Sequence, residues 1–276
     1  MKAAVEILQS MKLPDFPSAS SINYYNGRLY LVGDDANNIL VLDTAWQQLE
    51  KVPLFNYPEK RIPKPLKADL ETAVVLESDG QAALLIFGSA STGERKRMIR
   101  MPLPAAGETN DYHRFFPATY GDTFFNMLKE LDIDTVNIEG ATIIGEQLVL
   151  GNRGNNSRAV NQLLITTPDL WQDGQPKQLT IARLILPGET MRFAGISELC
   201  YIPGKDLLLV TLSSEDTASA YDDGPVGDSY LGWIEDAAAK INAPQVMLNG
   251  LLNLSATHPA FAGEKIEGIC VEKEEG

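Results

Sequence analysis

The sequence predicts an all-β protein, a β-propeller, from three observations. Short apolar, strand-like runs recur along the whole chain, helical patterns are sparse, and the runs fall into a repeat. Turn signals separate the paired runs, at Asn26-Gly27, Asp79-Gly80, Gly145 and Pro203-Gly204. Four antiparallel strands per unit, repeated at roughly forty to seventy residues, are typical of a propeller. A generic β-sandwich with accidental similarity between its strands is the alternative.

The repeat is marked by a glutamate at the start of an apolar strand. It appears in "LETAVVLESDG", "IEGATIIGEQ", "SELCYIPG" and "IEGICVE", and the four glutamates are Glu71, Glu139, Glu198 and Glu267. An upstream copy, "SSINYYNGRLYLVGDDANN", has Ser21 at the equivalent position. In the more complete copies a second apolar strand and a small polar loop follow. Five opening strands predict five blades, with six blades as the alternative.

The repeat also sets the expected organisation of a single domain over residues 1–276. A helical insertion is expected near 122–131, where the apolar residues of "DTFFNMLKEL" share one face. The last blade looks incomplete, because only one strand pattern is visible in it. The N-terminal residues 1–17 are expected to supply a closing strand there. The expected blades cover residues 18–66, 67–132, 133–192, 193–262, and 263–276 with the N-terminus.

Propeller topology predicts a polar site at one mouth of the central channel. The repeated glutamates begin the inner strands, and the polar loops follow the second strands, so both sets should lie at the same end. The expected binding residues are Glu71, Glu139, Glu198, Glu267, Asp34, Asp35, Asn152, Arg153 and Asn155. Crowded carboxylates need a cation, a proton or a basic partner, for which Arg153, Arg95 and Arg97 are candidates. The structural alternative is that each glutamate accepts hydrogen bonds from neighbouring strands and holds the blades together.

An oxygen-rich, histidine-poor site favours a hard cation, calcium before magnesium. The expected calcium ligands are Glu71, Glu139, Glu198 and Glu267. Gly140 and Gly268, which follow two of these glutamates, would allow close backbone approach near the axis.

Composition narrows the range of partners. The net charge of −14 argues against nucleic acid and against an anionic membrane surface. With only two cysteines, the sequence does not predict a disulfide scaffold. The two histidines show no pattern typical of a zinc site or of a Ser-His-Asp catalytic triad. No signal peptide or membrane-spanning run is visible, so a cytoplasmic location is expected, or a periplasmic or secreted one if a signal peptide has been removed.

The runs "KADLETAVVL", "NIEGATIIGEQLVLGNRGN", "ISELCYIPG", "YDDGPVGDSYLG" and "KIEGICVE" resemble a family of uncharacterised bacterial β-propeller proteins. That family is distantly similar to the propellers described by the esterase-like activity of phytase. The resemblance covers the chain from about Ser18 onward. It implies a propeller with a polar axial site able to bind calcium. Members of the family usually continue past the last Ile-Glu-Gly with another strand and an Asp-rich loop, whereas this sequence ends at Gly276.

Three functional hypotheses follow. The first is a propeller that binds an unidentified small molecule or protein at the acidic channel mouth, with calcium as a cofactor. The second is a calcium-dependent hydrolase of a phosphoester, ester or lactone, in which Glu215 or Asp216 acts as the base. The third is a non-catalytic interaction scaffold. Fold alone does not choose among them.

Overall fold

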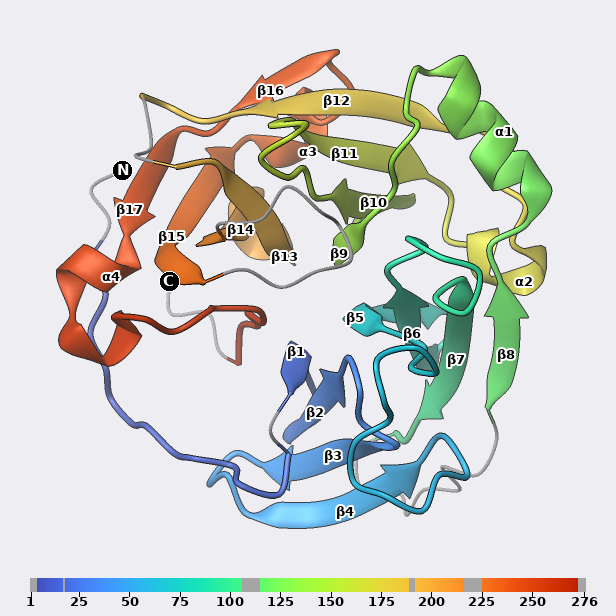
Figure 1. Ribbon diagram of the computed structural model, residues 1–276, viewed down its shortest axis with the longest axis vertical. Helices are drawn as coiled ribbons and strands as arrows, with labels where there is room; N and C mark the ends of the chain where they lie inside the picture. Colours follow the sequence, from blue (N-terminus) through green and yellow to red (C-terminus); the bar gives the residue numbers. More distant parts are fainter. Residues whose placement is uncertain (1–3, 17, 106–114, 189–191, 216–224, 273–276) are drawn as a thin grey trace.

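In the computed structural model, four β-sheets are arranged around a common axis as the blades of a propeller (Figure 1). The structure describes residues 4–16, 18–105, 115–188, 192–215 and 225–272. The all-β propeller prediction is therefore confirmed, but the predicted number of blades is wrong, because the described residues form four sheets and not five or six. No helix in the described part of the chain is long and apolar enough to cross a membrane.

The first two blades are simple antiparallel sheets in chain order. Asn26-Gly27 and Asp79-Gly80 join the first two strands of each blade, and all four residues have positive φ. Both pairs thus form the tight turns expected from Asn-Gly and Asp-Gly. The first blade contains β1 (Ala19–Tyr25), β2 (Arg28–Gly33), β3 (Asn38–Asp43) and β4 (Gln48–Pro53). The second contains β5 (Leu70–Ser78), β6 (Gln81–Gly88), β7 (Arg97–Leu103) and β8 (Phe116–Thr119).

The third and fourth blades are linked by an exchanged strand. The third contains β9 (Ile138–Ile144), β10 (Gln147–Asn152), β11 (Asn161–Thr166) and β12 (Thr180–Ile185). The fourth contains β13 (Ala194–Ile202), β14 (Leu207–Glu215), β15 (Val226–Glu235) and β17 (Gly250–Asn253). Strand β16 (Gln245–Met247) lies between β15 and β17 in the chain, yet it pairs in parallel with β12 of the third blade.

Helices are short and peripheral. The longest, α1 (Asp122–Glu130), lies in the expected insertion and buries Phe124 and Leu128. The remaining helical turns among the described residues are α2 (Leu170–Asp173), α3 (Ala237–Lys240), α4 (Leu254–Thr257), η1 (Pro203–Lys205) and η2 (Pro259–Phe261).

The hydrophobic core lies between successive blades. One cluster joins Val149 of the third blade to Val210 of the fourth, and another joins Val41 of the first to Leu84 of the second. The second strands are therefore apolar on both faces, because each blade is covered on both sides. This packing gives the first strands β1, β5, β9 and β13 a fixed place around the axis.

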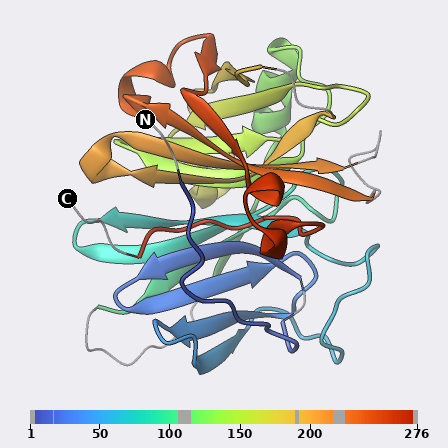
Figure 2. The same cartoon turned by 90° about the vertical axis from the view of Figure 1, so that its left-hand side faces the viewer.

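The C-terminal segment, residues 265–272, takes the place of a fifth first strand without forming a sheet. Figure 2 shows it in dark red, running between the orange fourth blade and the blue first blade. Cys270 packs on the first blade, and Val271 packs beside Trp233 of the fourth. The last expected blade is thus represented by one unpaired segment. Residues 4–16 carry no strand either, so the expected closing strand is not found there.

Candidate functional site

A β-bulge marks the same level of all four first strands. In each strand one extra residue interrupts the pairing with the second strand, and these residues are Ser20, Glu71, Glu139 and Ser197. A bulge re-aims the side chains on either side of it. The four positions therefore define a common level, which we call the upper mouth of the channel.

The bulges show that Glu198 is not equivalent to Glu71 and Glu139. Ser197 occupies the bulge of its strand, and Glu198 is the residue after it. Its counterparts are Ser21, Thr72 and Gly140, which form the next level down the channel. We call this level the waist. The sequence alignment placed Glu198 one residue out of step, and in a strand one residue reverses the direction of the side chain.

At the waist, the carboxylate of Glu198 binds groups from all four blades. Its Oε2 accepts a hydrogen bond from Ser21 Oγ at 2.6 Å, and its Oε1 accepts one from Thr72 Oγ1 at 2.7 Å. The backbone N–H groups of Ala141 and Leu199 donate to Oε1 at 3.1 and 3.0 Å. Burial raises the pKa of Glu198 to about 8, while these hydrogen bonds oppose the shift. Glu198 therefore has the structural role that was the alternative for the four repeated glutamates: it accepts hydrogen bonds from neighbouring strands and holds the blades together.

Glycine allows the close approach that the waist requires. A Cβ at Gly140 would lie 2.9 Å from Leu199 Cγ and 3.1 Å from the Leu199 nitrogen. A Cβ at Gly268 would lie 3.0 Å from the nitrogen of Ile22, which follows Ser21 as Leu199 follows Glu198. The expected close backbone approach at both glycines is confirmed. Gly268 therefore lies at the level of the waist, in the C-terminal segment that stands beside the four first strands.

On one side of the upper mouth, Lys67 lies between two carboxylates. Its ammonium pairs with Asp34 and, at 2.7 Å, with Asp69. Asp69 also pairs with Arg95 at 2.7 Å and accepts a hydrogen bond from Ser89 at 2.6 Å. The other oxygen of Asp34, Oδ1, is shielded from solvent and has no hydrogen-bond partner among the described residues.

On the other side, two basic residues and three carboxylates form a second network. Arg153 lies 3.8 Å from Glu139 and 3.6 Å from Glu215, and Lys265 pairs with Glu215 at 2.9 Å and with Glu267. Arg153 is fixed by hydrogen bonds to the carbonyls of Ile196 and Ser213 and to the Ser213 hydroxyl.

These contacts change the proton affinities of this network. Burial alone would lower the pKa of Lys265, but the carboxylates of Glu139, Glu267 and Glu215 outweigh it and raise that pKa. Burial raises the pKa of Glu139, against the opposing effect of Arg153 and Lys265. Asn137 also donates to Glu139 Oε1 at 2.8 Å.

Glu71 stands between the two networks without a partner of its own. Among the described residues, no hydrogen bond or ion pair reaches its half-buried carboxylate. Burial raises its pKa well above the usual value, and the nearby carboxylates of Asp69, Glu139, Asp34 and Glu267 raise it further. One oxygen each from Asp34, Asp69 and Glu71 lie within 4.8 Å of one another.

The upper mouth carries more negative than positive charge. Its described carboxyl groups are Asp34, Asp69, Glu71, Glu139, Glu215 and Glu267, and its basic groups are Lys67, Arg95, Arg153 and Lys265. With all of them ionised, two negative charges are unbalanced. A site of this kind favours a proton or an added cation.

Other expected site residues have local structural roles. Asn152 donates to Gln162 and accepts from the backbone of Asn137, within its own blade. Asn155 accepts hydrogen bonds from the backbone of Ser157 and Arg158 in its own turn. Asp35 pairs with Arg61 at 2.6 Å. Arg97 lies over the ring of Phe55, outside these networks, and Asp216 falls outside the described residues.

The sequence interpretation missed Lys67, Asp69 and Lys265, which supply much of the network. A spacing signal was present in the chain. Lys67, Asp69 and Glu71 alternate at intervals of two, and Lys265 precedes Glu267 by the same interval. An alternating charge pattern at the head of an inner strand would have identified these partners.

Comparison with known proteins identifies a family without a known activity. The sequence profile of a family of unknown function, DUF6929, matches residues 15–276. No curated protein sequence matches.

Several solved structures are similar to the chain at low sequence identity. Glutaminyl cyclase from Myxococcus xanthus is 14% identical, with 94% of this chain and 82% of that chain covered and a TM-score of 0.49. A chain of a nidogen/laminin complex is 11% identical, with 84% of this chain and 83% of that chain covered and a TM-score of 0.41. Virginiamycin B lyase from Staphylococcus aureus is 12% identical, with 80% of this chain and 64% of that chain covered and a TM-score of 0.37. At these values the likeness concerns the fold and indicates nothing about activity.

Proposed function

Because the chain belongs to the DUF6929 family, whose function is unknown, we propose a function from the geometry of the site. The protein binds a cation at the upper mouth of the channel, calcium in the first instance, with Glu71 as the central ligand. The observation that carries this proposal is the carboxylate of Glu71, which no hydrogen bond or ion pair from the described residues reaches and whose carboxylate neighbours raise its pKa. A bound cation would favour the ionised form and balance the excess negative charge.

The spacing of the oxygens supports a hard cation. Calcium binds carboxylate oxygens at about 2.3–2.6 Å, so two oxygens on opposite sides of the ion are about 5 Å apart. The oxygens of Asp34, Asp69 and Glu71 fall within this spread. The carboxylates of Glu139 and Glu267 raise the pKa of Glu71, so they stay in the proposed ligand set. Glu198 does not, because both of its oxygens accept hydrogen bonds at the waist.

Lys67 is the internal competitor for this site. Its ammonium already pairs with Asp34 and Asp69, and the Glu71 carboxylate adds to its electrostatic stabilisation. An added cation must therefore bind on the Glu71 side or displace the ammonium. The proposal is limited to binding, because Glu215, the described candidate base, is ion paired with Lys265 and Arg153.

Calcium-dependent thermal unfolding tests the proposal. At a calcium concentration of 100 times Kd, a ligand of the native state stabilises by about 2.7 kcal/mol, so Tm should rise relative to EDTA. Glu71→Gln should abolish the rise. Glu77→Gln is the matched control, because Glu77 lies on the same strand at its other end and is exposed. A wild-type Tm that is the same in EDTA and in calcium would contradict the proposal.

Lys67→Met tests whether the cation binds beside Asp34 and Asp69. Removing the ammonium frees the Asp34 carboxylate and Oδ1 of Asp69 to bind a cation, while Oδ2 of Asp69 stays paired with Arg95, so calcium affinity should rise about tenfold or more. The variant should be less stable than wild type in EDTA, because the partly buried Asp34 loses its ion pair and the buried Asp69 keeps only Arg95 and Ser89. An unchanged affinity, with wild-type binding intact, would place the ion away from Asp34 and Asp69.

A further inference from the structure

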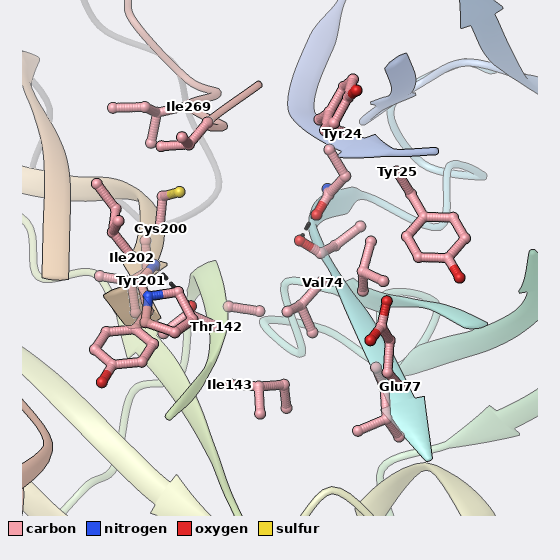
Figure 3. A pocket seen from close by; sticks show the side chains of 18 of the residues that line it. Tyr24, Tyr25, Val74, Glu77, Thr142, Ile143, Cys200, Tyr201, Ile202 and Ile269 are labelled. Atoms are coloured by element: carbon pink, nitrogen blue, oxygen red, sulfur yellow. Dashed lines mark hydrogen bonds between the residues drawn. The ribbon is translucent and has the colours of Figure 1, made fainter. Parts of the chain in front are cut away.

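Below the waist, the channel opens into a pocket of about 920 Å³. The lower halves of all four first strands and the C-terminal segment line it, and Figure 3 shows Tyr201 across the pocket from Tyr24 and Tyr25. We call this pocket the lower mouth. Its volume is that of a small-molecule site. It is independent of the upper mouth, because the hydrogen bonds of Glu198 to Ser21 and Thr72 lie between them.

Apolar side chains that remain partly exposed form part of its walls. Val75, Leu76, Ile143 and Ile269 line the pocket and are each only half-buried. A concave surface of this kind keeps apolar area in contact with solvent, and such patches commonly mark ligand sites.

Among the described residues that line the pocket, the charged side chains are all of one sign. Glu77 and Glu272 are the only charged side chains among the described residues that line it. Both are exposed, and in Figure 3 the side chain of Glu77 lies on the same wall as Tyr25. An anionic ligand would find no basic partner among the described residues of the lining, whereas a cation would find a carboxylate.

The aromatic side chains match the same ligand. Tyrosine faces attract cations, with the largest effect for alkylated ammonium groups that are weakly hydrated. Three tyrosines, an apolar wall and an acidic rim thus form a complementary surface for such a group with an apolar body attached. We propose that the lower mouth binds an organic cation, an apolar or aromatic molecule that carries a protonated or quaternary amine.

Three small probes with one ring and different charges test the proposal. Benzyltrimethylammonium, benzyl alcohol and benzoate are titrated in turn and followed by ligand-detected NMR. Probes of this size bind weakly, with a Kd on the order of 0.1–1 mM for the best of them. Benzyltrimethylammonium should bind at least tenfold more tightly than benzoate, with the neutral alcohol between them. Equal binding of the three probes, or no binding of the cation, would overturn the proposal.

Charge-reversal variants locate the bound cation. Glu77→Lys should weaken benzyltrimethylammonium binding three- to tenfold. Glu50→Lys, the same change at an exposed position on the outer strand β4, should leave it unchanged. Tyr25→Leu, which keeps an apolar side chain but removes the ring, should also weaken binding. Equal effects of Glu77→Lys and Glu50→Lys would show a general effect of net charge and would refute this site.

Glu71→Gln separates this inference from the proposed calcium site. The variant should bind the organic cation as wild type does, because it alters only the upper mouth. Loss of binding in Glu71→Gln would mean that the probe occupies the upper mouth, and would overturn the assignment to the lower one.

Discussion

Two levels of the same channel use the same side chain in opposite ways. At the waist, Glu198 accepts hydrogen bonds from residues of all four blades and is 1% exposed. At the upper mouth, Glu71 begins a strand of the same repeat, is half-buried, and has no such partner among the described residues. A shift of one residue relative to a bulge separates the two roles. The comparison teaches that a repeated residue type does not fix a repeated function when bulges set the direction of the side chain.

The largest expected effect comes from removing the carboxylate at the waist. Glu198→Ala leaves two hydroxyls and two backbone N–H groups without their acceptor, and should lower the free energy of unfolding by about 3–5 kcal/mol. Glu198→Gln keeps the size and one acceptor oxygen, and should cost roughly half as much. Urea denaturation measures both. A loss below about 1 kcal/mol in Glu198→Ala would show that the waist does not hold the blades together.

Much of the fold could be predicted from the sequence because its signals are local. The alternation of apolar residues and the Asn-Gly and Asp-Gly turns gave the strands, and the amphipathic pattern of residues 122–131 gave α1. The number of blades could not be predicted in this way. "KIEGICVE" has the pattern of a first strand and lies where one belongs, but a blade also needs partner strands, and the described residues supply none there.

For the candidate site, the sequence indicated several of the carboxylates but not the basic residues that pair with them. Glu139 and Glu267 belong to one ion-pair network through Arg153, Glu215 and Lys265, and their carboxylates raise the pKa of Glu71. The bulge that moves Glu198 out of this group leaves no signature in a single sequence, because it depends on pairing with β14. Asn152 lies on a blade that meets the rim, but its amide is used inside that blade.

An effect of intermediate size is expected on the pH dependence of stability, to which both Glu71 and Glu198 contribute. The folded-state pKa values of Glu71 and Glu198 both lie above the usual 4.5, that of Glu198 at about 8. Between the unfolded and folded pKa values, the native state holds protons that the unfolded state has lost. Stability must therefore fall as pH rises through this window.

Substitution by glutamine should remove part of this slope. Relative to wild type without added cation, Glu71→Gln should gain stability as pH rises from 5 to 8, by roughly 1 kcal/mol at neutral pH. Urea denaturation at several pH values measures the change, and Glu77→Gln corrects for the general effect of net charge. If wild type and Glu71→Gln show parallel pH profiles, Glu71 is not strained by its neighbours.

The smallest effect is expected at Asn155, which was predicted to bind at the rim and instead caps its own turn. Its Oδ1 accepts hydrogen bonds from the backbone N–H groups of Ser157 and Arg158, both at 3.0 Å. Asn155→Ala should lower the free energy of unfolding by about 0.5–1 kcal/mol, as the loss of a local cap does. Calcium affinity, measured by the same thermal shift as for Glu71→Gln, should stay at the wild-type value. A clear loss of affinity would return Asn155 to the binding site and would extend the upper mouth beyond the carboxylates of the first strands.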